Sequence, residues 1–162
     1  MSRTNDEASL FRFLIEALIL VLYEIATTVS QYLPPLIGIC FAFVVLEYHE
    51  RTRAMQNLGL AWYGAVAFLF FAEQIHGFYL FSALIAFIIF YSLFFNWLFV
   101  SLKWRSGLLF IFIAAGYMLS WGVSSFFTYT KSEQVLAFGI QYLIYIVLEG
   151  LLAMVFLRHR LV

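Results

Sequence analysis

The stretch that decides the fold is LEYHERTRAMQNLGLAWYGAVAFLFFAEQIHGFY, which runs from Leu46 to Tyr79. It contains a polar segment rich in charge (residues 49–57), a short apolar run (58–72) and a second polar break (73–77). Nearly continuous apolar sequence lies on both sides of it. Because polar breaks between apolar runs mark the ends of buried or lipid-facing helices, the pattern predicts a series of apolar helices joined by short connections.

The composition predicts an integral membrane protein. Of the 162 residues, 65% are apolar and 11% are charged, whereas a soluble domain has about 45–50% and about 25%. Backbone groups in a bilayer must bond to one another, which favours helices, and the bilayer itself is the first predicted partner. The net charge of zero gives no support for a nucleic-acid partner. A single cysteine, Cys40, excludes a disulfide or a cysteine-based metal site within one chain.

The apolar runs predict one compact, all-α transmembrane domain that covers residues 1–162. About six spans are expected, at 13–30, 36–48, 58–72, 78–100, 108–127 and 135–157. Pro34-Pro35 separates the first two spans, and Gly77 precedes the fourth. The second and third are short for a bilayer that needs about 20 apolar residues, so one re-entrant hairpin is an open alternative. The first span is predicted to be a retained anchor rather than a signal peptide, because glutamates interrupt it and no clear cleavage site follows.

The basic residues predict the orientation. With six spans, only Lys131 falls on one side of the membrane. The other side receives eight basic residues: Arg3, Arg12, Arg51, Arg53, Lys103, Arg105, Arg158 and Arg160. The positive-inside rule then places both termini in the cytoplasm.

Glu16 and Glu24 are the most informative polar residues, because both interrupt the first apolar span. They lie about 80° apart around a helix, and a charge at mid-bilayer costs roughly 2.5–3.5 kcal/mol on insertion scales. Arg12 is a candidate partner for Glu16. Glu24 needs another partner, and the candidates are Gln31, Asn96 and Gln141. The two acids either form a polar site or subunit contact, or they hold the bundle together. Glu149 is a further isolated acid in the sixth span.

A charged group follows the second span and is predicted to be a cytoplasmic contact. It contains Glu47, Arg51 and Arg53 and is expected to form a solvated loop with local ion pairs, or a docking patch for a partner. The histidines are predicted to form no site, since His49 and His76 fall on opposite sides. The start His49-Glu50 lacks the second histidine of a zinc protease. No catalytic, metal or cofactor site is therefore predicted.

A resemblance to a known family supplies a function. The similarity covers residues 35–93: a proline before a Leu-rich span, a short basic loop, a short Gly-containing span and a Gly-bearing turn before a long helix. These features are Pro35, residues 49–53, Gly59 with Gly64, and Gly77, and the basic tail 158–160 also fits. The arrangement resembles the rod-shape-determining MreD family, although Phe68 stands where members usually carry an Asp.

The resemblance implies a non-enzymatic scaffold in the bacterial inner membrane. Such proteins work in the elongation machinery for peptidoglycan, beside MreC, the actin-like MreB, RodA and a penicillin-binding transpeptidase. The competing interpretation is a small-molecule-binding transporter subunit, similar to the substrate-capturing subunits of energy-coupling-factor transporters. In that case Glu16, Glu24, Glu149 and the loop around Glu73 and His76 would line a pocket for a small cationic or polar ligand.

Overall fold

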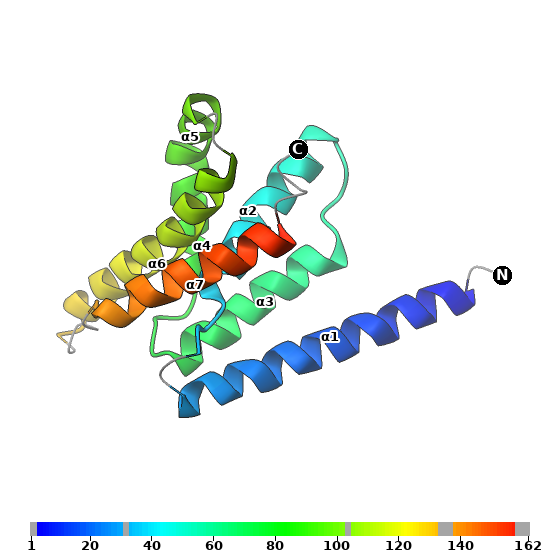
Figure 1. Ribbon diagram of the computed structural model, residues 1–162, viewed down its shortest axis with the longest axis horizontal. Helices are drawn as coiled ribbons and strands as arrows, with labels where there is room; N and C mark the ends of the chain where they lie inside the picture. The colour runs from blue at the N-terminus through cyan, green and yellow to red at the C-terminus, as the bar shows by residue number, and fades with distance from the viewer. Residues whose placement is uncertain (1–2, 31–32, 103–104, 133–137, 158–162) are drawn as a thin grey trace.

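The elements of the chain follow its apolar runs and end where proline, glycine or charge interrupts them. The computed structural model describes residues 3–30, 33–102, 105–132 and 138–157, and the regular elements in these ranges are all helices (Figure 1). In chain order they are α1 (Arg3–Val29), α2 (Ile37–Arg53), α3 (Leu60–Ile75), α4 (Ser82–Ile89), η1 (Phe90–Phe95), α5 (Asn96–Ser101), α6 (Arg105–Thr130) and α7 (Ile140–Phe156). Because α4, η1 and α5 are continuous, the described residues form a compact bundle of six helical rods, which confirms the all-α prediction.

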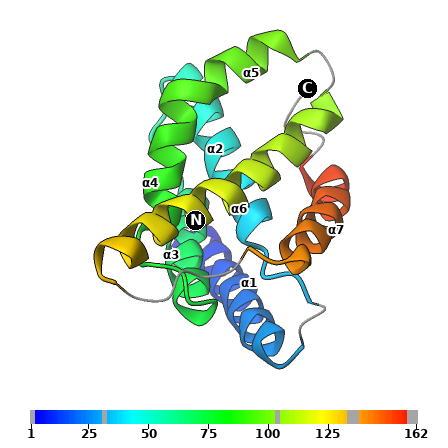
Figure 2. The same cartoon turned by 90° about the vertical axis from the view of Figure 1, so that its left-hand side faces the viewer.

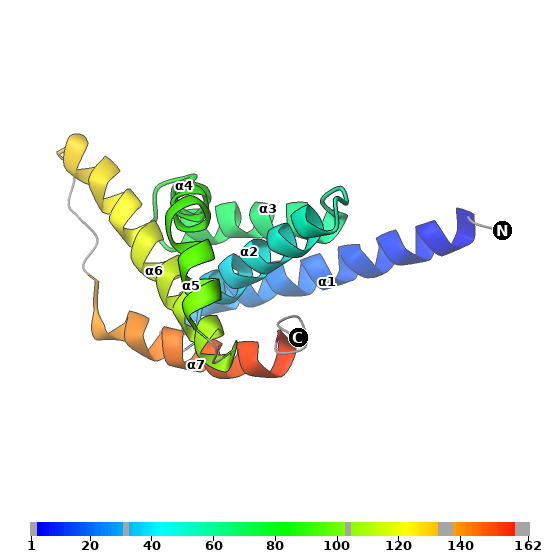
Figure 3. The same cartoon turned by 90° about the horizontal axis from the view of Figure 1, so that it is seen from above.

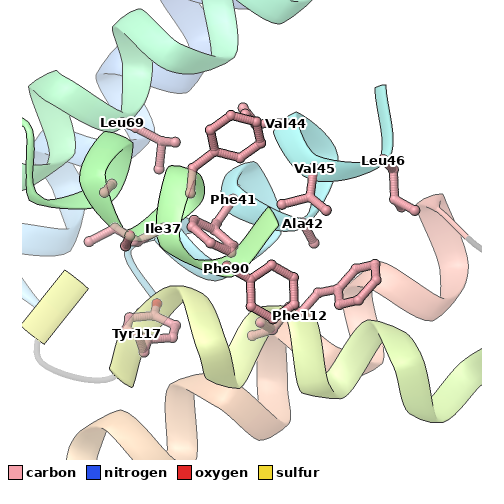
Figure 4. Packing of buried hydrophobic residues seen from close by; sticks show 14 of the residues in the cluster. Ile37, Phe41, Ala42, Val44, Val45, Leu46, Leu69, Phe90, Phe112 and Tyr117 are labelled. Atoms are coloured by element: carbon pink, nitrogen blue, oxygen red, sulfur yellow. The ribbon is translucent and has the colours of Figure 1, made fainter. Parts of the chain in front are cut away.

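Helix α2 lies at the centre of the bundle. It packs against α3, α4, α6 and α7, and Figure 4 shows its Ile37, Phe41 and Val45 side chains among those of Phe90 and Phe112. All five are at most 2% exposed. The core is therefore built around an apolar helix that the other rods enclose.

Helix α1 is the least embedded rod. Its main packing partner is α3, and its N-terminal half extends beyond the rest of the bundle in Figures 1 and 3. Apolar side chains project from several sides of it, including Phe11, Leu18, Ile19 and Val29. The C-terminal half of α1 enters the bundle, where Glu24 and Thr27 are buried.

The rod made of α4, η1 and α5 changes direction in its middle. Residues 90–95 form a π-helix, and α5 leaves at an angle to α4 (Figure 2). A π-helical turn adds a residue to the hydrogen-bonded ring, and it therefore rotates and bends the helix beyond it. Trp97 and Val100 on α5 are exposed.

Two rods are long and apolar enough to cross a membrane, on length and composition alone. They are Ser82–Ser101 and Gly107–Thr130, and Leu60–Ile75 and Ile140–Phe156 are apolar but shorter. Two to four apolar helices are compatible with a membrane protein. Six full crossings stay a prediction.

The helix boundaries differ from the predicted spans at α2. Residues 49–53, predicted to be a loop, continue the helix to Arg53. The predicted loop is wrong here because Arg51 Nε donates to Glu47 Oε1 at 2.9 Å, one turn back, which stabilises another turn. The chain turns only afterwards, at Met55, whose φ is 53°.

Candidate functional site

Among the described residues, three carboxylates are fully buried in the bundle: Glu24 on α1, Glu73 on α3 and Glu149 on α7, each 0% exposed. A buried charge is costly unless it is paired or hydrogen-bonded. The partners of each acid therefore reveal what that acid does.

Glu149 holds the beginning of α2. Its Oε2 accepts a hydrogen bond from the backbone N–H of Ile39 at 2.8 Å, and its Oε1 accepts one from the Tyr117 hydroxyl. The first N–H groups of a helix have no partner within the helix, and the helix dipole favours a negative charge there. Leu36, the residue before α2, has no side-chain oxygen that could cap the helix. Glu149 supplies this cap instead.

Glu73 holds the beginning of α4 in the same way. Its Oε2 accepts from the Phe81 N–H at 2.9 Å, and its Oε1 accepts from the Ser82 hydroxyl at 2.6 Å and from the Ala83 N–H. Phe81 itself cannot cap the helix with its side chain. An acid at the end of one helix therefore fixes the start of the next.

Both capped helices begin at a residue in the left-handed region. Leu36 has φ 55° and Phe81 has φ 71°, a conformation that costs a side-chain-bearing residue roughly 1–2 kcal/mol. The chain before each is not helical, and Pro34, Pro35 and Phe78 are buried. The carboxylate bonds compensate for this backbone conformation.

Glu24 is only partly satisfied. Its Oε1 lies 2.8 Å from His76 Nε2, which is also 3.2 Å from Thr27 Oγ1. Because the Thr27 hydroxyl donates to the Glu24 carbonyl at 2.6 Å, the consistent assignment has His76 Nε2 donating to Glu24. The other carboxylate oxygen, Oε2, is buried and has no hydrogen-bond partner among the described residues.

Glu24 and Glu149 belong to one polar region, which we call the polar cluster: Tyr23, Glu24, Thr27, His76, Tyr117 and Glu149. His76 meets Glu24 and Thr27 on one side of it, and Tyr117 meets Glu149 on the other. The Tyr23 hydroxyl donates to the Pro34 carbonyl at 3.0 Å. The cluster thus joins the C-terminal turns of α1 to α2, α6, α7 and the α3–α4 turn.

Two of the predicted partners of Glu24, Asn96 and Gln141, are exposed rather than buried beside it, and the third, Gln31, lies outside the described residues. Glu24 pairs instead with His76, which was expected beside it only in the transporter alternative. The sequence did contain a signal for this contact. His76 follows the third apolar run and Glu24 lies near the end of the first, and these two ends are predicted to lie on the same side of the membrane. Glu16, in contrast, is exposed and the structure does not bring it to Glu24, while the Arg12 side chain lies outside the described part.

The residues of the predicted cytoplasmic contact, at the C-terminal end of α2, differ in how far they are buried. Glu47 is 3% exposed and holds Arg51, whose Nη1 also donates to Gln56 Oε1 at 3.2 Å. Arg53 is exposed. Glu47 therefore positions Arg51 rather than offering a carboxylate to a partner, and Arg53 is the more accessible of the two arginines.

His49 adds a titratable group beside this segment. Its ring centroid lies 4.7 Å from that of Phe95 and 5.1 Å from that of Phe99. Burial, followed by the positive charge of Arg53, holds the pKa of His49 below its usual range. His49 is thus favoured in its neutral form in the fold.

Within the described residues, no group of three or more His, Cys, Asp or Glu side chains is arranged to hold a metal ion. Comparison with models of known families, with curated proteins and with solved structures found no match for the chain. Its class, as far as fold and site define it, is an apolar six-helix bundle with buried acids at helix starts.

Proposed function

We propose that this chain is a multi-pass protein of the bacterial inner membrane and a non-enzymatic scaffold resembling MreD. In this role it supports the cell-wall elongation machinery, beside MreC, RodA and a penicillin-binding transpeptidase. The resemblance over residues 35–93 motivates the proposal, and the distribution of polar and apolar groups supports it.

The observation that carries the proposal is the outward apolar surface of α1 and α7. Leu14, Leu18 and Leu22 on α1 are each more than half exposed, as are Leu143 and Val147 on α7. Two of the three fully buried acids are used to fix helix starts. A bundle of this kind offers lateral faces to lipid and to the helices of other membrane proteins, which associate by packing.

The predicted cytoplasmic contact contains Glu47, Arg51 and Arg53, and its two arginines carry the charge that a partner can reach at the end of α2. Since Glu47 holds Arg51 on the surface, the two arginines present positive charge where the chain leaves the bundle. Such a patch suits a partner with an acidic surface, and exposed charges chiefly set the rate and specificity of association.

The test is a tagged pull-down of the full chain from gently solubilised native membranes, with mass spectrometry of the captured proteins. We expect MreC, RodA or the transpeptidase, and we expect Arg53→Glu to lower their recovery several-fold at unchanged membrane insertion. Arg53→Lys keeps the charge, and Lys131→Glu reverses a charge at the opposite end of the bundle, so both should leave recovery unchanged. Capture of none of these partners by the unaltered chain would refute the proposal.

A second candidate function is a small-molecule-binding transporter subunit. The partly satisfied carboxylate of Glu24 favours it, because a buried acceptor without a donor is a feature of a binding site. In the same pull-down, recovery of an ATPase pair with a coupling subunit would replace the scaffold with this alternative.

A further inference from the structure

We propose that an apolar groove between α4 and α6 binds one anionic phospholipid of the outer leaflet, with an acyl chain in the groove and the phosphate at Lys131. The inference rests on the membrane location that the proposed function includes, and it is independent of the scaffold role.

The groove is a hollow of about 400 Å³ on the surface where α4 and α6 pack together. Its lining contains no polar side chain, and both helices contribute to it: Ile85 and Ile89 from α4, and Met118, Gly122, Phe126 and Phe127 from α6. The absent side chain of Gly122 leaves open space, since a Cβ there would have no atom within 4 Å. A helix with its side chains is about 10–12 Å across and would lie over such a hollow, whereas an acyl chain can enter it.

The length of the groove matches one leaflet of a bilayer. Met118 lies in the middle of the predicted span 108–127, and Phe126 is about 12 Å from it along the helix axis, at about 1.5 Å per residue. The hydrocarbon of one leaflet is about 15 Å deep, half of a core of about 30 Å. On the same scale Lys131 is about 20 Å from Met118, which is the level of the headgroups. The groove therefore ends where a phosphate would lie.

An aromatic stack places the charge of Lys131 at that end of the groove. Phe127, which lines the groove, stacks on Tyr79 with ring centroids 5.6 Å apart. Lys131 Nζ lies 4.5 Å from the centroid of the Tyr79 ring, and the Lys131 N–H donates to the Phe127 carbonyl at 3.2 Å. Because Tyr79 precedes α4 and Phe127 is on α6, the two walls of the groove meet beside the ammonium group.

The charge selects the class of lipid. Lys131 is the one lysine or arginine that the predicted topology places on the outer side. A lysine near the membrane surface favours an anionic headgroup, by an amount that corresponds to roughly five-fold in affinity. A zwitterionic headgroup carries its own cation, which competes with Lys131 for the phosphate. Phosphatidylglycerol, with a phosphate and no cation, has the chemistry that this end of the groove recognises.

The test is native mass spectrometry of the purified full chain in detergent. The chain is titrated with phosphatidylglycerol or with phosphatidylcholine of the same acyl chains, and the first lipid adduct is followed. We expect the apparent Kd to be about five-fold lower for phosphatidylglycerol. Raising the ammonium acetate concentration should reduce this difference, because salt screens an exposed charge.

Two variants separate the acyl chain from the headgroup. Gly122→Leu fills the hollow without meeting another atom at its Cβ, so it should lower the affinity for both lipids at least ten-fold at unchanged Tm. Ala67→Leu adds a similar side chain at an exposed position of α3 outside the groove and should keep both affinities. Lys131→Glu should remove the preference for phosphatidylglycerol, and Lys131→Arg should keep it.

Three results would overturn the proposal. They are equal affinities of the unaltered chain for the two lipids, unchanged lipid affinity in Gly122→Leu, and equal losses in Gly122→Leu and Ala67→Leu. If Gly122→Leu lost recovery of MreC or RodA at unchanged lipid affinity, the groove would belong to a helix of a partner protein and not to a lipid. Lipid selectivity without recovery of any partner would reject the scaffold proposal and support the lipid site.

Discussion

Glu73 offers the sharpest test of how this bundle is held together, because one side chain accepts three hydrogen bonds at the start of α4. In Glu73→Ala the Phe81 N–H, the Ser82 hydroxyl and the Ala83 N–H lose their acceptor. Phe81 is 48% exposed, so water can replace that bond, whereas Ser82 and Ala83 are 0% exposed. Two unsatisfied buried donors at about 1–3 kcal/mol each predict a loss of roughly 2–6 kcal/mol.

This loss is a large part of the stability of a typical domain, which is about 5–15 kcal/mol. At about 2–4 °C per kcal/mol for a chain of this size, Glu73→Ala should lower the Tm by roughly 5–20 °C. Glu73→Gln keeps one acceptor oxygen but turns an N–H₂ group toward a donor. Its Tm should therefore lie between that of Glu73→Ala and that of the unaltered chain.

The measurement is thermal unfolding of the purified chain in one detergent, followed by tryptophan fluorescence. Gln74→Ala is the matched control, since Gln74 is the next residue on α3 and is exposed. If Glu73→Ala unfolds within experimental error of Gln74→Ala, Glu73 does not hold the start of α4 and the capping argument fails.

Two further predictions use the same assay. A Cβ on Gly38 would lie 2.5–2.9 Å from side chains of α6 and α7, so Gly38→Ala should destabilise the chain by about 1–3 kcal/mol. Gly122 faces open space, so the control Gly122→Ala should be neutral or slightly stabilising. Equal effects of the two substitutions would contradict the packing around Gly38. His49 lies beyond the predicted span 36–48 and its pKa is lowered by burial. Its contribution to stability is therefore complete above the unfolded pKa of about 6.5 and is lost as the pH falls through that value. His49→Gln should show a smaller drop in Tm between about pH 7 and about pH 5, and parallel profiles would refute this.

The helical class and the main breaks could be predicted because they depend on local chemistry. Pro34-Pro35 cannot continue a helix, and α2 begins just after it. Gly77 adopts φ 73° in the turn after α3, a conformation that glycine takes at little cost. Both features are properties of a few neighbouring residues, so a single sequence contains them.

The roles of the acids could not be predicted, because they depend on contacts between distant segments. Glu149 caps a helix that begins more than a hundred residues earlier, and Glu24 meets His76 from another helix. One local signal was present: Leu36 and Phe81 precede helices without a side-chain oxygen to cap them. Such a start, next to a proline or glycine break, indicates that a cap comes from elsewhere in the fold.

The three buried acids therefore have different meanings, although the sequence presents each as an unexpected charge in apolar surroundings. Glu73 and Glu149 complete helix starts, and each of their oxygens has a donor. A mutation there acts on folding first. Glu24 has no helix start to complete, and one of its oxygens is buried without a partner among the described residues. Glu24 differs in this respect from the other two acids, whose oxygens all have donors. The unfilled oxygen is therefore the feature that separates Glu24 from the two acids that fix helix starts.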